Sequence, residues 1–214
     1  MRGKPVCLVF GAGEYFKPPS DFRAADFIIA ADGGLAYLEK HNITPNLIVG
    51  DFDSLSGPPG RGPNTIVLPQ EKDDTDMVAA LREGWKRGYR IFHIYGGTGG
   101  RLDHTLANIQ CVAGIACHGG RGYLFDKDTV ITAIRDGSIS FSAGAEGVIS
   151  VFSHSETATG VYERGLKYPL NNATLRSTYP LGVSNEFTGT PGSISVQSGI
   201  LLVIYPIHTQ EVFP

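Results

Sequence analysis

The sequence predicts an α/β N-terminal domain with an open, mostly parallel sheet, followed by an all-β antiparallel sandwich domain. Up to about residue 126, short apolar runs alternate with segments of helical periodicity, and this alternation is typical of βαβ units in an open sheet. After residue 127, only 11 of the last 87 residues are charged and 29 are Ser, Thr or Gly, without a helical period. We therefore expect the two domains to span residues 1–127 and 128–214.

Six apolar runs in the first half predict strands. They are residues 6–10, 27–31, 47–50, 65–68, 90–95 and 122–125. Most are continuous rather than alternating, as expected for a parallel sheet that is covered on both faces. Helices are expected at residues 35–41, 75–87 and 105–118, and in the second of these Met77, Leu81 and Trp85 form an apolar stripe.

The second half contains short runs separated by turn residues. These runs are residues 130–134, 147–152, 193–197 and 200–205. Residues 193–197 alternate polar and apolar side chains, which is typical of a strand with one face in water. A small antiparallel sandwich or barrel accounts for this pattern.

Composition excludes several classes of function. A net charge of -3 disfavours non-specific nucleic-acid binding, which needs a basic surface, but a bound cation can still recruit a phosphorylated ligand. The three cysteines lack CxxC spacing, which indicates free thiols in a reducing compartment. We do not expect the short apolar run after Arg2 and Lys4 to act as a leader, and no run approaches the roughly 20 residues of a membrane span. We expect a cytoplasmic protein that binds neither nucleic acid nor membrane.

Acidic and glycine-rich segments follow four successive predicted strands. They are Asp32-Gly33-Gly34, Asp51-Phe52-Asp53-Ser54, Glu71-Lys72-Asp73-Asp74-Thr75-Asp76 and Gly96-Gly97-Thr98-Gly99-Gly100-Arg101-Leu102-Asp103-His104. Ligands of open α/β sheets bind at the carboxyl ends of the strands. The four segments are therefore expected to converge on one edge of the sheet.

Clustered carboxylates repel one another, and a hard divalent cation relieves that repulsion. Asp51 and Asp53 form the best ligand pair, because a spacing of two residues in extended chain directs both side chains to one side. Asp76, at the start of a predicted helix, can complete the set. Mg²⁺ needs few protein ligands, because it keeps several waters and also binds substrate phosphates.

The glycine-rich segment supplies phosphate donors. Residues 96–100 follow a strand and precede a helix, so their N–H groups can surround phosphate oxygens, and Arg101 adds a fork-shaped donor. Helix capping remains an alternative for Asp32 and Asp103, and His104 is as readily a structural residue as a base. The signal at Gly11-Ala12-Gly13 is weak, because the dinucleotide fingerprint lacks its third glycine.

In order and spacing, these four segments resemble the motifs of the thiamine pyrophosphokinases, with Lys72-Asp73-Asp74-Thr75-Asp76 as the third motif. Ser184-Asn185-Glu186-Phe187 resembles a later motif of that family, and residues 199–205 resemble its closing strand. The resemblance covers nearly the whole chain, and the length suits the bacterial form. It implies an α/β catalytic domain that binds ATP and Mg²⁺, a β-sandwich that binds thiamine, and a homodimer with active sites at the interface.

The resemblance also implies the reaction, in which ATP and thiamine give AMP and thiamine diphosphate. Asp51, Asp53 and Asp76 would hold Mg²⁺, and these three with Asp103 would be the catalytic residues. The nucleotide-binding residues would be Asp32, Gly33, Gly97, Gly99, Gly100, Arg101, Asp103 and His104, with Asp32 supporting the metal or its water shell. The substrate-binding residues would be Lys72, Thr75, Ser184 and Asn185.

One departure from the family concerns thiamine stacking. Some members stack thiamine on a C-terminal tryptophan, whereas the single tryptophan here is Trp85. Another residue, such as Phe187, would have to take that place, or the stacking partner would be absent. Two other functions remain as alternatives: a kinase or pyrophosphokinase for another hydroxylated heterocycle, and a nucleotide-sensing module without catalysis.

Overall fold

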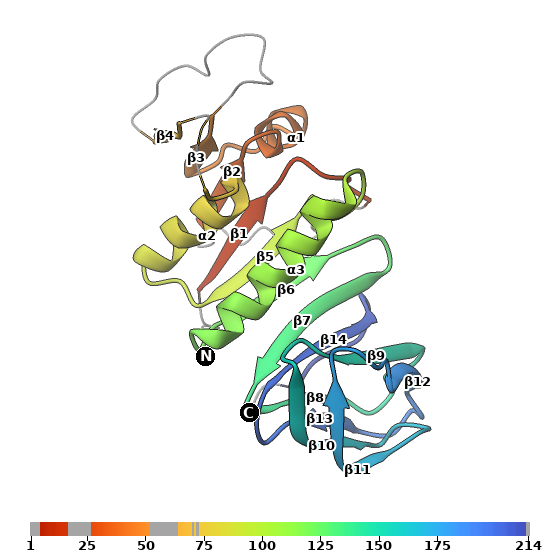
Figure 1. Cartoon of the computed structure of the whole chain (residues 1–214). Coiled ribbons are helices and arrows are strands. Elements are labelled where there is room, and N and C mark those ends of the chain that lie inside the picture. Colours follow the sequence, from red (N-terminus) through yellow and green to blue (C-terminus); the bar gives the residue numbers. More distant parts are fainter. Residues whose placement is uncertain (1–4, 17–26, 52–63, 70, 72, 213–214) are drawn as a thin grey trace. The chain divides into compact units, whose positions relative to one another are not determined.

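The computed structural model describes residues 5–16, 27–51, 64–69, 71 and 73–212 (Figure 1). The chain divides into two compact units. The described residues up to Cys111, together with Leu124–Lys127, form the first unit, and residues 112–123 with the described chain from Asp128 onward form the second. None of the helices in the described residues combines the length and apolar composition that a membrane span requires.

The first unit contains a parallel sheet. Its strands are β1 (Val6–Phe10), β2 (Phe27–Ala31), β3 (Leu47–Gly50), β4 (Thr65–Val67) and β5 (Ile91–Tyr95). The order is β5-β1-β2-β3-β4, and all four pairings are parallel. The predicted parallel sheet is therefore confirmed.

Helices α1 (Gly34–Lys40) and α2 (Asp76–Lys86) cover this sheet. Successive strand residues point to opposite faces. On β1, Leu8 and Phe10 pack with Leu38 of α1, whereas a Cβ added to Gly84 of α2 would lie 3.0 Å from the Cys7 sulfur. The two helices thus cover opposite faces, which explains why β1 is a continuous apolar run.

The apolar stripe of α2 differs in part from the predicted one. Its buried residues are Met77, Ala80, Leu81 and Gly84, whereas Trp85 is only partly buried. Arg90 places its guanidinium carbon 4.0 Å from the centre of the Trp85 ring. The buried positions follow the spacings of three and four residues that a helix face requires.

Helix α3 (Leu102–Cys117) and strand β6 (Arg121–Phe125) complete the α/β part of the chain. Helix α3 begins three residues before its predicted start. The strands of the second unit are β7 (Thr129–Arg135), β8 (Ser138–Phe141), β9 (Val148–Ser153), β10 (Thr157–Arg164), β11 (Leu170–Arg176), β12 (Gly182–Glu186), β13 (Gly192–Ser195) and β14 (Ile200–Pro206).

The second unit is antiparallel throughout its described strand pairs. β7, β14, β9 and β12 pair in that order, and β8, β13, β10 and β11 pair in a second sheet. Burial alternates along β14, where Leu201, Val203 and Tyr205 are buried and the residues between them are partly exposed. This confirms an antiparallel sandwich whose core lies between alternating side chains.

Candidate active site

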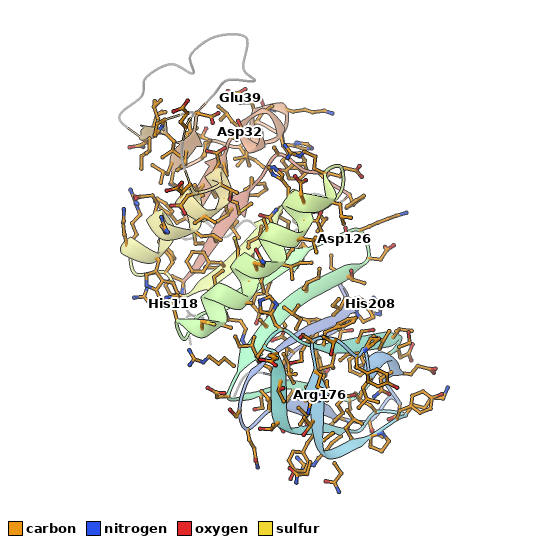
Figure 2. All side chains as sticks on the ribbon, in the orientation of Figure 1. Asp32, Glu39, His118, Asp126, Arg176 and His208 are labelled. Carbon is orange, nitrogen blue, oxygen red and sulfur yellow. The ribbon has the colours of Figure 1, made fainter. Side chains whose placement is uncertain are left out.

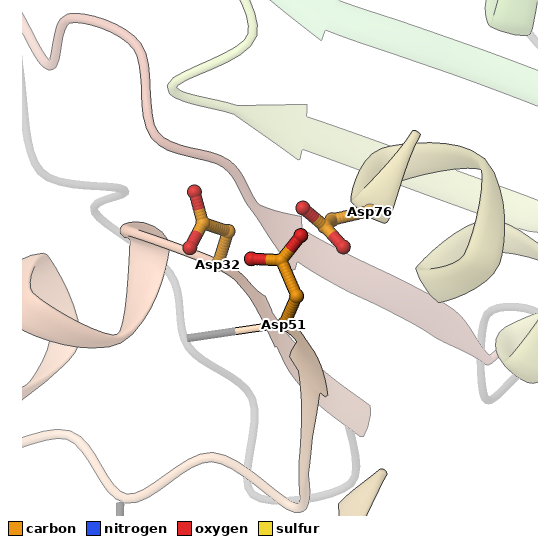
Figure 3. Close-up of side chains that lie close together, drawn as sticks. All are labelled: Asp32, Asp51 and Asp76. Carbon is orange, nitrogen blue, oxygen red and sulfur yellow. The ribbon is translucent and has the colours of Figure 1, made fainter. Parts of the chain in front are cut away.

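Three aspartates come together at the carboxyl ends of the parallel strands. Asp32 directly follows β2, Asp51 directly follows β3, and Asp76 is the first residue of α2. One carboxylate oxygen from each lies within 4.8 Å of those of the other two (Figure 3). In the described part of the chain, these three residues form the group whose spacing could hold a metal ion, and each of them is partly buried.

The meeting of Asp32 and Asp51 follows from strand pairing. β2 and β3 are parallel neighbours with Ala31 opposite Val49, so the chain leaves both strands at the same edge. The Asp32 N–H donates to the Val49 carbonyl at 2.8 Å. Asp53, the second member of the predicted ligand pair, lies outside the described residues. Asp32, which was expected to support the metal or its water shell, is a member of the group.

The turn after β2 explains the Asp32-Gly33-Gly34 sequence. Asp32 has a φ of +47°, a left-handed conformation that aspartate tolerates better than most residues. A Cβ on Gly34 would lie 2.0 Å from the Phe10 carbonyl oxygen, and one on Gly33 would lie 2.9 Å from the Cβ of Ala12. Both glycines are therefore needed for α1 to begin directly against β1.

Thr75 fixes the start of α2 and hence the position of Asp76. The Thr75 hydroxyl accepts a hydrogen bond from the Val78 N–H at 3.3 Å, as an N-cap does. Asp76 then lies in the first turn, where a negative charge is stabilised by the helix dipole. Asp74 pairs with Arg82 farther along the helix, and Lys72 lies outside the described residues.

The glycine-rich segment after β5 is hydrogen-bonded to the loop after β1. Gly13 donates its N–H to the Gly96 carbonyl at 2.7 Å, and Glu14 donates to the Thr98 carbonyl at 2.8 Å. A Cβ on Gly13 would lie 2.4 Å from the Thr98 carbonyl oxygen. Gly11-Ala12-Gly13, which is weak as a dinucleotide fingerprint, therefore serves the close approach of two backbones.

Two side chains that sequence reasoning missed anchor the glycine-rich segment. Asn108 of α3 is buried and donates to the Gly97 carbonyl at 2.7 Å. The buried Thr98 hydroxyl donates to Asp126 at 2.8 Å. Asp126 directly follows β6 (Figure 2). Gly99 and Gly100 follow with φ of +76° and +61°. Neither anchor has a local sequence signal, because each bond joins residues at least eleven positions apart.

Arg101, Asp103 and His104 are all exposed at the start of α3. The Arg101 guanidinium donates two hydrogen bonds to Asp103, at 3.1 and 2.6 Å. This pairing lowers the pKa of Asp103 to about 2, with help from the His104 N–H. Exposed pairs contribute little to stability, so Arg101 can exchange Asp103 for a phosphate at small cost. Asp103 and His104 do not belong to the aspartate group described above.

Ser184 and Asn185 lie on β12 in the second unit. Ser184 is exposed with a φ of +59°, and Asn185 is buried with 4% of its surface exposed. Phe187, a candidate for stacking, is also buried, and its ring packs edge-on against Phe141 with ring centres 5.1 Å apart. Of these residues, Ser184 presents its side chain at the surface.

Comparison with known proteins agrees with both units. Residues 20–119 match the family described as thiamin pyrophosphokinase, catalytic domain, and residues 138–201 match thiamin pyrophosphokinase, vitamin B1 binding domain. A thiamine pyrophosphokinase of Bacillus subtilis is 33% identical over 182 residues, which are 82% of this chain and 85% of that protein.

Solved structures give the same result. The crystal structure of thiamine pyrophosphokinase from Bacillus subtilis superposes with a TM-score of 0.83 at 30% identity, covering 96% of this chain and all of that one. That of thiamin pyrophosphokinase from Geobacillus thermodenitrificans has a TM-score of 0.77 at 28% identity, covering 94% and 97%. On these matches the chain belongs to the thiamine pyrophosphokinase family.

Proposed function

We propose that the chain transfers the pyrophosphoryl group of ATP to the hydroxyl of thiamine, giving thiamine diphosphate and AMP. The observation that carries this proposal is the meeting of Asp32, Asp51 and Asp76 at one edge of the parallel sheet, in a chain of this family. In the reaction the hydroxyl oxygen of thiamine forms a bond to the β-phosphorus. The bond from that phosphorus to the oxygen bridging to the α-phosphate breaks, AMP leaves, and the hydroxyl proton is released.

The three carboxylates suit Mg²⁺. They offer oxygen atoms from three separate segments within 4.8 Å of one another, and carboxylate oxygen is the ligand that this cation prefers. We propose Asp51, Asp53 and Asp76 as its ligands, with Asp32 as a further ligand or as an acceptor for its waters. When bound, Mg²⁺ supplies positive charge that neutralises the phosphate oxygens of ATP.

The chain's own groups bind and orient the nucleotide. Gly97, Gly99 and Gly100 would donate backbone N–H groups to phosphate oxygens, and two of them have the left-handed conformation found in anion-binding turns. Arg101 would bind phosphate with its guanidinium, and Asp103 and His104 would engage the rest of the nucleotide. Gly33 would allow the nucleotide to approach the backbone closely beside Asp32. Displacement at phosphorus depends mainly on such positioning and on charge neutralisation.

The acceptor end of the site is assigned to four residues. Lys72 and Thr75 would lie near the substrate end of the site, Ser184 would reach the pyrimidine of thiamine, and the buried Asn185 would support Ser184 from the interior. Residues 1–127 would then be the catalytic domain and residues 128–214 the thiamine-binding domain. We further propose a cytoplasmic homodimer with the active sites at the subunit interface. Asp103 joins the three metal ligands as a catalytic residue in this scheme.

The nucleotide product tests the proposal. The protein is incubated with ATP, Mg²⁺ and thiamine, and the products are separated by chromatography. AMP and thiamine diphosphate in equal amounts, both dependent on thiamine, are expected. ADP with thiamine monophosphate would mean phosphoryl transfer and would refute pyrophosphoryl transfer. The absence of any thiamine-dependent product would refute thiamine as the acceptor substrate.

A further inference from the structure

Glu163 is a carboxylic acid inside the sandwich. It lies on β10 with none of its surface exposed. Its Oε2 accepts a hydrogen bond from Asn185 Nδ2 at 2.7 Å, whereas its Oε1 has no hydrogen-bond partner among the described residues. Burying a carboxyl group with one satisfied oxygen costs folding free energy. An apolar side chain would fill this place at lower cost, so the carboxyl is expected to have another role.

Asn185 uses its whole amide within the chain. Its Nδ2 donates to Glu163 and to the Tyr168 carbonyl, the latter at 2.8 Å. Its Oδ1 accepts from the N–H groups of Tyr168 and Glu186, both at 2.9 Å. These four bonds exhaust the capacity of an asparagine amide. Asn185 therefore links β12 to the connection between β10 and β11 by hydrogen bonds. The hydrogen bond to Glu163 fixes the orientation of the Asn185 amide.

The residue before Asn185 is the one held in an unusual conformation. β12 contains one extra residue relative to β9, because Gly182 pairs with Val151 and Asn185 pairs with Ile149. Ser184 lies in this bulge with a φ of +59°, which costs free energy for a residue other than glycine. Bulges re-aim a side chain at the edge of a sheet. Here the bulge turns Ser184 to the surface.

Glu163 supports this bulge at both of its ends. Its Oε2 holds Asn185 at one end. At the other end, a Cβ added to Gly182 would lie 3.2 Å from Glu163 Oε1, so that oxygen lies against the glycine backbone. One buried carboxyl group therefore spans the two residues that frame Ser184.

We propose that Glu163 is a positioning residue for the acceptor substrate, which sets the place of Ser184 through Asn185 without touching the substrate itself. This inference rests on the proposed function and on the assignment of Ser184 to the thiamine end of the site. The residues involved fall within the segment 138–201 that matches a vitamin B1 binding domain. Loss of the hydrogen-bond acceptor on Glu163 frees the Asn185 amide and lets the bulge relax. The binding of thiamine is therefore weakened, whereas nucleotide binding stays intact.

Steady-state kinetics of three variants test this role. Glu163→Met keeps the size but removes the acceptor, and we expect the KM for thiamine to rise about tenfold, the equivalent of one lost hydrogen bond. The kcat at saturating thiamine and the KM for ATP should stay within about twofold of wild type. Glu163→Gln keeps an oxygen for Asn185 and should restore the thiamine KM. Glu163→Asp withdraws the carboxylate by one methylene and should raise that KM by about threefold.

Thr132→Val is the matched control. Thr132 is fully buried on β7 of the same unit, and its hydroxyl donates to the Gly122 carbonyl at 2.7 Å. Its replacement removes a buried hydrogen bond from the sandwich without affecting the Ser184 bulge. We expect a lower melting temperature with an unchanged KM for thiamine.

The outcomes separate this inference from the proposed function. A wild-type protein without thiamine-dependent AMP overturns both. With an active wild type, an unchanged thiamine KM in Glu163→Met, a Gln variant as impaired as the Met variant, or an equal KM rise in Thr132→Val overturns the positioning role alone. If Glu163→Met does not fold, Glu163→Asp decides, and an unchanged thiamine KM in that variant refutes the role.

Discussion

Replacing Glu163 by Gln should make the protein more stable at alkaline pH. Burial raises the pKa of Glu163 from 4.5 to about 7, and the hydrogen bond from Asn185 opposes this only in part. Between these values the folded protein keeps the proton while the unfolded chain has lost it. The contribution of Glu163 to stability is therefore complete below pH 4.5 and is lost as the pH rises through about 7.

The size of the effect follows from the two pKa values. A rise from 4.5 to about 7 corresponds to a loss of about 3 kcal/mol of unfolding free energy between acid and alkaline pH, at 1.36 kcal/mol for each unit. Glutamine has the same shape and does not titrate, so the Glu163→Gln variant does not lose this unfolding free energy as the pH rises. The free energy of unfolding of Glu163→Gln minus that of wild type should therefore rise by about 3 kcal/mol between pH 4 and pH 8.

Urea unfolding followed by circular dichroism at pH 4, 6 and 8 measures this difference. All other titrating groups are present in both proteins, so their contributions cancel when the variant is compared with wild type. A difference that changes by less than about 1 kcal/mol over this range would refute the reasoning, because it would mean that the carboxyl is hydrated in the folded protein. The carboxyl carbon resonance of Glu163 should titrate with a midpoint near 7 in the wild type.

Three further predictions concern the α/β part of the chain. Asp51→Asn should abolish Mg²⁺-dependent turnover and leave the melting temperature near wild type, and an unfolded variant would mean that this carboxylate is structural. Gly34→Ala should destabilise by about 2 kcal/mol or more, because its Cβ would lie 2.0 Å from a backbone oxygen of β1. In contrast, Gly114→Ala within α3 should stabilise by up to about 1 kcal/mol, because its Cβ would meet no described atom within 4 Å apart from its chain neighbours and the backbone of the helix. Thermal unfolding that ranks these two variants the other way contradicts the packing argument. Arg101→Gln should raise the pKa of Asp103 from about 2 toward 3.8, and a carboxyl NMR titration with an unchanged midpoint would show that the pair does not form in solution.

The buried strands were the most predictable elements. β1, β2 and β3 begin and end at the predicted residues, because a strand covered on both faces is apolar along its length and each of these strands is followed by Gly or Asp. The start of α3 was predicted three residues late. The segment around Asp103 resembles a cap, whereas the helix already begins at Leu102 within the glycine-rich segment.

The candidate site was predictable in its composition and, for Asp51 and Asp76, in its membership. The aspartates at strand ends are visible in the sequence. Asp32 was expected only to support the metal, yet it lies in the same group as Asp51 and Asp76. That grouping depends on β2 being the neighbour of β3, and strand order leaves no local trace in the sequence.

By itself, the sequence determined the two kinds of architecture, the family and the acidic segments at the strand ends. Each of these depends on local pattern, since apolar periodicity and turn residues act over a few positions. Only the tertiary structure decided that Gly13 pairs with the Gly96 segment, that Asn108 anchors Gly97, and that Glu163 lies behind the Ser184 bulge. These contacts join residues far apart in the chain, and burial, which gives the Glu163 carboxyl its altered acidity, exists only once the sheets have packed.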